Sequence, residues 1–111
     1  MSPADALPLA TVNCDKYTGP SCLRELRNIP KGTNPHPNNS FGIYQPVWLT
    51  WLPEDLDQFF GLFEPELKGE RPVLEPIDGG YTQTDYKMLP FNVEPDLDFE
   101  YAMALTAPQK L

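Results

Sequence analysis

Residues 92–102 read NVEPDLDFEYA, and this stretch decides how the rest of the chain is interpreted. It predicts a short helix that begins at Pro95, because proline fits the first helical turn, where its missing N–H is not needed. Acidic residues gather at this predicted N-terminus, where the helix dipole favours negative charge. Leu97, Tyr101 and Ala104 or Leu105 follow the spacing of an apolar stripe that a core can accept.

Glu94 and Asp98 are the candidate catalytic residues of this stretch. They lie four positions apart, so both carboxylates leave the same helix face, with Cβ atoms roughly 5–6 Å apart. Two such groups, when partly buried, can share a proton, which allows one of them to act as a general base in acid. The alternative interpretation is that these acidic residues only cap the helix.

A resemblance favours the catalytic interpretation. Glu-x-Asp-Leu-Asp-x-x-Tyr-Ala, from Glu94 to Ala102, resembles the catalytic helix of the sedolisins, the serine-carboxyl peptidases that include tripeptidyl peptidases. Cys14 with Cys-Leu-Arg-x-Leu at residues 22–26, and Asp-Leu-Asp-x-Phe-Phe at residues 55–60, are similar to segments of fungal sedolisins. The resemblance implies peptide-bond hydrolysis in acid, with Glu94 as the general base and Asp98 as its partner. It also implies a subtilisin-like α/β fold and a secreted, extracellular protein.

The order of predicted elements agrees with part of such a fold. Apolar runs at 41–45 and 72–77 predict two buried strands, and 19–29 and 53–63 predict helices that each begin at a proline. The acidic side of the 53–63 helix is expected to be a solvated surface. Alternation of strands and helices favours a parallel sheet with crossover helices. We therefore expect an incomplete, partial three-layer subtilisin-like fold.

Composition limits the class of protein. The chain has 111 residues, 16 acidic against 8 basic side chains and a net charge of −8, which makes nucleic acid and anionic membranes unlikely partners. No apolar run approaches the length that spans a bilayer. Residues 1–12 are expected to be a disordered lead-in without the features of a signal peptide. Residues 13–111 are expected to be the N-terminal portion of a sedolisin-like peptidase catalytic domain.

Cys14 and Cys22 are the only cysteines. A zinc site needs about four ligands, and the lone His36 lies in a separate loop, so a disulfide is the favoured interpretation over a metal site. A disulfide indicates an oxidising compartment. Asn38-Asn39-Ser40 is an N-glycosylation acceptor pattern, which agrees with that compartment.

The chain departs from the family pattern in its serines. Family members carry the nucleophile in a Gly-Thr-Ser-x-Ser motif, whereas Ser2, Ser21 and Ser40 all lack that context. The aspartate that stabilises the oxyanion and the calcium site of the family are also missing from this sequence. We therefore expect no cofactor in this chain, with calcium in the C-terminal part of the family domain, and no peptidase activity from the chain alone. The expected partners are a peptide or protein substrate and that C-terminal part.

The sequence is also compatible with two other functions. One is a non-catalytic protein-binding module derived from the same scaffold, which uses the proline-rich and aromatic surface. The other is a small hydrolase that acts in acid through paired carboxylates alone, as glycosidases do.

Overall fold

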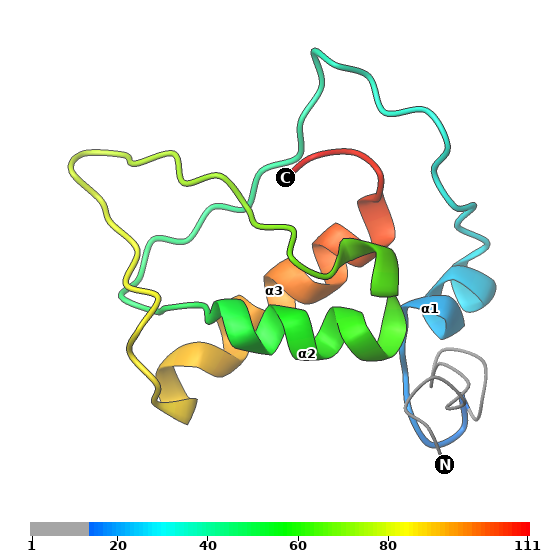
Figure 1. Ribbon diagram of the computed structural model, residues 1–111, viewed down its shortest axis with the longest axis horizontal. Helices are drawn as coiled ribbons and strands as arrows, with labels where there is room; N and C mark the ends of the chain where they lie inside the picture. Colours follow the sequence, from blue (N-terminus) through cyan, green and yellow to red (C-terminus); the bar gives the residue numbers. More distant parts are fainter. Residues whose placement is uncertain (1–13) are drawn as a thin grey trace.

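The computed structural model describes residues 14–111, and within this range the chain forms three α-helices, one short 3-10 helix and no β-strand. The helices are α1 (Pro20–Arg27), α2 (Pro53–Phe63) and α3 (Leu89–Thr106), and the 3-10 helix η3 (Pro65–Leu67) follows α2. Helices α2 and α3 lie against each other at the centre, and α1 lies beside α3 (Figure 1). The prediction for residues 1–12 lies outside the described residues.

The predicted α/β fold is wrong, since a parallel sheet with crossover helices needs strands and residues 14–111 form none. Both predicted strands, 41–45 and 72–77, are irregular and mostly exposed: Tyr44 is 73% and Ile77 64% exposed. A strand requires a partner that supplies a ladder of hydrogen bonds, and periodicity in the sequence cannot supply one. Pro72 and Pro76 also lack two of the N–H donors that a ladder would use. The three-layer subtilisin-like arrangement is therefore not seen.

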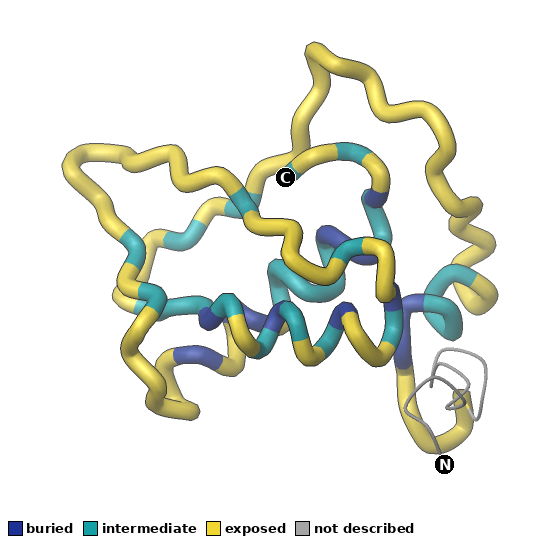
Figure 2. Tube along the Cα trace, viewed as in Figure 1, coloured by how far each residue is buried: buried dark blue, intermediate teal, exposed yellow. Residues whose placement is uncertain are grey.

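The core lies between α2 and α3. Leu56 and Phe60 are completely buried and pack with Met103. Burying a side chain of this size contributes roughly 1.5–3 kcal/mol. Five partly buried residues surround this centre: Trp51, Phe59, Leu67, Phe99 and Leu111. Figure 2 shows the buried positions concentrated on the two central helices, while the long connections are exposed.

Helix α2 has the predicted bounds, Pro53–Phe63. Pro53 opens it, and Leu56 and Phe60, one turn apart, form its buried face. Phe59 contacts Phe63 and Tyr101, with ring centroids 4.8 and 5.1 Å away. These local signals were sufficient to define the helix.

Helix α3 begins at Leu89, six residues before the predicted start at Pro95. Pro90 lies in its first turn, and Pro95 lies inside the helix. An interior proline leaves the carbonyl four residues earlier without its helical donor. That carbonyl, of Phe91, instead accepts the N–H of Thr50 at 2.9 Å. The predicted stripe is correct only in part, because Ala104 is buried while Leu97 is exposed.

The side chain of Asn92 secures the first turn of α3 and is only 3% exposed. Its Oδ1 accepts the N–H of Met88 at 2.7 Å, and its Nδ2 donates to the carbonyls of Thr50 (2.9 Å) and Tyr86 (3.0 Å). One amide therefore joins the helix to two loop segments.

The predicted helix near the N-terminal end is confirmed as α1, and the disulfide between Cys14 and Cys22 is present. Asn28 ends α1 in the left-handed conformation (φ 54°), and the N–H of Ile29 returns to the Arg24 carbonyl at 2.9 Å. Arg24 also donates to the carbonyl of Ala104 at 2.5 Å, which holds α1 on α3.

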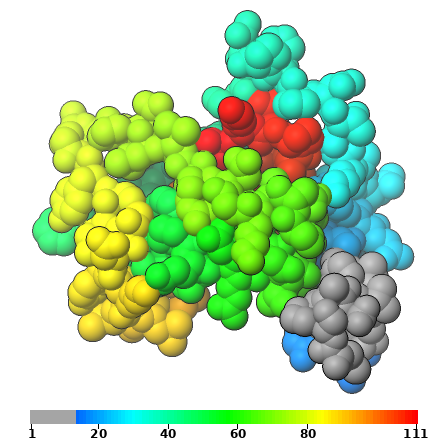
Figure 3. Space-filling model, in the orientation of Figure 1, coloured from blue at the N-terminus to red at the C-terminus, as the bar shows by residue number. Residues whose placement is uncertain are grey.

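Long irregular loops at 28–52 and 68–88 connect the helices. The first loop is tied to the end of the chain, because the His36 N–H donates to Gln109 Oε1 at 3.1 Å and the Phe41 N–H donates to the Lys110 carbonyl at 3.1 Å. In the space-filling view the final residues, in red, lie beneath this loop, in cyan (Figure 3). No helix in residues 14–111 has the length and apolar character required to span a bilayer.

Candidate functional site

The two candidate catalytic residues lie one turn apart on α3. Glu94 is exposed and Asp98 is partly buried, while Pro95 and Asp96 between them face the protein interior. Gln45 Nε2 donates to Glu94 Oε2 at 3.4 Å. Within residues 14–111 no hydrogen bond joins Glu94 to Asp98. The helix therefore presents both carboxylates on its outer side, as the spacing predicted.

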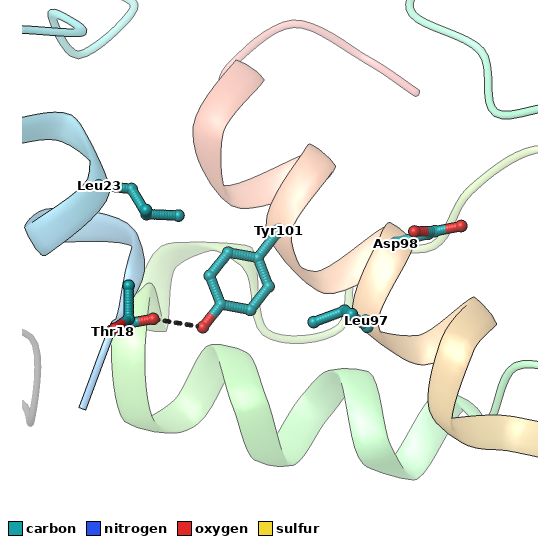
Figure 4. Close-up of a pocket in the computed structure, with 5 residues that line it drawn as sticks. All are labelled: Thr18, Leu23, Leu97, Asp98 and Tyr101. Carbon is teal, nitrogen blue, oxygen red and sulfur yellow. Dashed lines mark hydrogen bonds between the residues drawn. The ribbon is translucent and has the colours of Figure 1, made fainter. Parts of the chain in front are cut away.

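Asp98 lies at a shallow, open depression of about 460 Å³. Four other residues line it: Thr18, Leu23, Leu97 and Tyr101. Figure 4 shows the Tyr101 ring pointing toward Thr18, whose carbonyl accepts the tyrosine hydroxyl at 2.6 Å, whereas the Asp98 carboxylate points the other way. The depression combines apolar walls from α1 and α3 with one acidic group at its edge.

A second acidic pair, Asp96 and Glu100, lies on the opposite side of α3. Two residues of helix correspond to a rotation of about 200°, so this pair faces inward where Glu94 and Asp98 face outward. Asp96 is 6% exposed, and its Oδ1 accepts the N–H of Leu52 at 2.7 Å. Leu52 is the N-cap residue of α2 and has no cap from its own side chain. The Asp96 carboxylate therefore supplies an acceptor at the start of α2.

The inward-facing carboxyls are shifted toward their protonated forms. Burial raises the pKa of Asp96 to about 7, and a hydrogen bond with Asp55 and its charge act in the same direction, against the opposing Leu52 N–H. Burial raises the pKa of Glu100 to about 8, and the charges of Asp96 and Asp55 add to this shift. The three carboxyls thus form one interacting group between α2 and α3.

Sequence reasoning missed this group. The spacing of Asp96 and Glu100 was visible in the sequence, but only the neighbouring pair was given a role. The prediction of a solvated acidic side of α2 is wrong for Asp55, which is partly buried and interacts with Asp96. The signal that could have found the group is two acidic pairs, each spaced by four residues, on opposite sides of one helix.

The serines and the histidine lie on other elements than these carboxyls. Ser21 is in α1 and Ser40 is in the 28–52 loop, while Ser2 lies outside the described residues. His36 is exposed in that loop, and its Nδ1 accepts the N–H of Asn38 at 3.2 Å. Among residues 14–111, no group of three or more His, Cys, Asp or Glu side chains has a metal-binding arrangement.

A separate buried acid lies at the end of α2. Glu64 is 7% exposed and pairs with Lys31 Nζ at 3.6 Å. Burial raises the pKa of Glu64, with neighbouring Glu66 adding to the shift, whereas the Lys31 hydrogen bond lowers the pKa of Glu66. The ion pairs of Lys31 with Glu64 and Glu66 join the 28–52 loop to the end of α2 and to η3, which is a structural role.

Comparison with known proteins found similar sequences among fungal peptidases. Tripeptidyl-peptidase SED1 of Arthroderma otae is 50% identical over 105 residues, which cover 95% of this chain and 15% of that protein. Aorsin of Aspergillus oryzae is 37% identical over 109 residues, which cover 96% of this chain and 16% of that protein. Tripeptidyl-peptidase sed1 of Aspergillus fumigatus is 31% identical over 100 residues.

The chain spans about 15% of the length of the curated relatives that it matches. No family model and no solved structure matches the chain.

Proposed function

We propose, from the membership of this chain in the sedolisin family of peptidases, that it carries the Glu/Asp half of the catalytic apparatus of an acid-acting serine peptidase. The observation that supports this proposal best is the position of Glu94 and Asp98 on the outer face of α3, one turn apart and open to an incoming group. Peptides or proteins are the corresponding substrates.

In this proposal Glu94 is the general base and Asp98 is its partner. A base that works in acid must be deprotonated there, and an imidazole with a pKa of about 6.5 would be mostly charged. A carboxylate meets this requirement. Asp98 lies one turn away on the same face of α3, where side chains four positions apart come close together.

The serine nucleophile is proposed to come from a further part of the peptidase domain, because the serines of this chain lack the family motif. Exposed apolar side chains support a partner of this kind: Trp48 is 90% exposed, and Tyr81 and Leu89 are also mostly exposed. Exposed apolar patches mark interaction surfaces. The same observation supports the second candidate function, a non-catalytic protein-binding module.

We also propose that the protein is secreted and glycosylated. The Cys14–Cys22 disulfide is typical of an oxidising compartment. Asn38 lies in an exposed turn and is the acceptor of the Asn38-Asn39-Ser40 pattern.

The test uses a peptidase domain that contains this chain. Glu94→Gln and Asp98→Asn should each reduce kcat by a factor on the order of 10²–10⁴, the usual share of acid–base catalysis, with little change in KM. Glu75→Gln, in the exposed 68–88 loop, is the matched control and should keep the parental rate. Normal turnover by Glu94→Gln would refute the catalytic assignment and favour the binding module.

A further inference from the structure

The buried acidic group at the α2–α3 junction has no role in the proposed chemistry. It lines a groove of about 610 Å³ between the two helices, to which Asp55, Asp96 and Glu100 all contribute. Asp96 links the elements directly, since it belongs to α3 and accepts the N–H of Leu52 at the start of α2. Its position in the helix lies midway between Glu94 and Asp98.

The charges around Asp96 do not neutralise it. From α2, Asp55 hydrogen-bonds with Asp96, while Glu54 binds Lys87 Nζ at 2.6 Å. Lys87 is the basic residue that lines the groove, and its ion pair is with Glu54. Asp57 of α2 pairs with Arg71. Within residues 14–111, therefore, Asp96, Asp55 and Glu100 form no ion pair, although the charge of Lys87 also acts on Asp55.

A hydrogen bond between two carboxyls requires a proton on one of them. Asp96 already uses one oxygen as the acceptor for Leu52, so its other oxygen is available to the Asp55 carboxyl. Ionisation of both acids would place two negative charges side by side, with Asp96 buried and Asp55 partly buried, and the burial of charge is costly. The geometry favours a junction that keeps a proton.

We propose that Asp96 is a positioning residue, which shares a proton with Asp55 to hold α3 against the start of α2 and thereby makes the placement of Glu94 and Asp98 depend on acidic conditions. The link to catalysis rests on the proposed function, whereas the protonated junction is independent of that function. Loss of the shared proton would release the helical turn that carries both Glu94 and Asp98.

The sign of the pH dependence follows from the pKa shifts. The folded-state pKa of Asp96, about 7, and that of Glu100, about 8, both lie above the usual values for these acids. Between the usual pKa values and these folded-state values, the folded state therefore binds more protons than the unfolded state. The stabilisation is complete in acid, below the usual pKa values, and is lost as the pH rises through about 7–8. For each proton involved, the unfolding equilibrium constant should rise roughly tenfold per pH unit within the window.

The experiment measures urea unfolding of the 111-residue chain from acidic to mildly alkaline pH, for the parent and for Asp96→Asn. An amide resembles the protonated acid, because it keeps an acceptor for Leu52 and gains a donor toward Asp55. The parent midpoint should fall as the pH rises, and the fall should be smaller in the variant, where Glu100, whose pKa is raised by its own burial, still contributes. At neutral pH the variant should be more stable than the parent, which a purely structural role of Asp96 would not produce. Glu94→Gln, the same kind of change on the outer face, should keep the parental profile.

If the urea-unfolding midpoint depends on pH in the same way in Asp96→Asn and in the parent, the proposal is overturned, regardless of the peptidase activity of either protein. In the peptidase domain, Asp96→Asn should move the alkaline limb of the kcat/KM profile to higher pH. If the pH dependence of unfolding is weaker in Asp96→Asn while Glu94→Gln keeps normal turnover, the proton-dependent junction is supported and the proposed function is refuted. If the pH dependence of unfolding is weaker in Asp96→Asn but the alkaline limb of its kcat/KM profile does not move, the junction is supported and its link to catalysis is refuted.

Discussion

The N–H of Thr50 donates to the carbonyl of Phe91 at 2.9 Å, at the one place in α3 where Pro95 removes the helical donor. A loop residue thus completes the hydrogen bonding of a helix 41 positions further along the chain. Asn92, in the next position of the helix, binds the carbonyl of the same threonine. The interior proline is tolerated because a second segment replaces what it lacks.

We expect Asn92→Ala to destabilise the protein by about 1–3 kcal/mol, because the substitution leaves partly buried backbone groups of Met88, Thr50 and Tyr86 without their partners. Urea unfolding measures the change. Val93→Ala is the matched control, since Val93 is adjacent in α3 and half exposed. Equal effects of the two substitutions would show that the amide network contributes little.

Gly32→Ala should destabilise the protein by about 1–3 kcal/mol through overpacking. A Cβ at Gly32 would lie 2.6 Å from the carbonyl oxygen of Ala107, so the loop or the end of α3 must move. Gly42→Ala in the same loop is the control, because its Cβ would meet nothing within 4 Å. Thermal unfolding of both variants tests this contact, and an unchanged midpoint for Gly32→Ala would contradict it.

The isolated chain should not hydrolyse peptides at any pH, because its serines lack the context of the family nucleophile. The measurement is peptide turnover by the purified 111-residue chain from acid to alkaline pH. Turnover that disappears in Glu94→Gln would contradict this expectation and would favour a hydrolase that acts through its carboxylates alone. Turnover that persists in that variant would indicate a contaminant.

Expression in a fungal secretory host should add one N-linked glycan at Asn38. Treatment with an endoglycosidase that removes such glycans should then lower the intact mass, and Asn38→Gln should abolish the difference. Asn39→Gln is the control, because it keeps an asparagine at 38 and a serine at 40 and hence the acceptor pattern. A parent protein without a removable glycan would count against the site.

The sequence was sufficient for the elements whose signals are local. In α2, Pro53 at the start and the one-turn spacing of Leu56 and Phe60 determine both the bounds and the buried face. For α1, Pro20 marks the start, but the left-handed Asn28 ends the helix at Arg27, two residues before the predicted end. The true start of α3 could not be found like this, because its first turn depends on Thr50, far away in the sequence.

The apolar runs at 41–45 and 72–77 show a different limit. An apolar run bounded by turn residues predicts a strand only if a partner strand exists, and none of the described segments provides one. For the site, spacing alone placed Glu94 and Asp98 on one face of α3. The inward position of Asp96 and Glu100 follows from the packing of α2 on α3, which the helical pattern left undecided.

The contact between Gln109 and the 28–52 loop has a consequence for the order of assembly. Gln109 binds the backbone of His36 and of Asn39, positions about 70 residues earlier in the chain. During synthesis this loop therefore waits without its anchor while the ribosome adds more than half of the chain. Contacts of such long range form late and slow folding. Until then the 28–52 loop lacks the contacts that hold it in place and is open to chaperones and to neighbouring nascent chains.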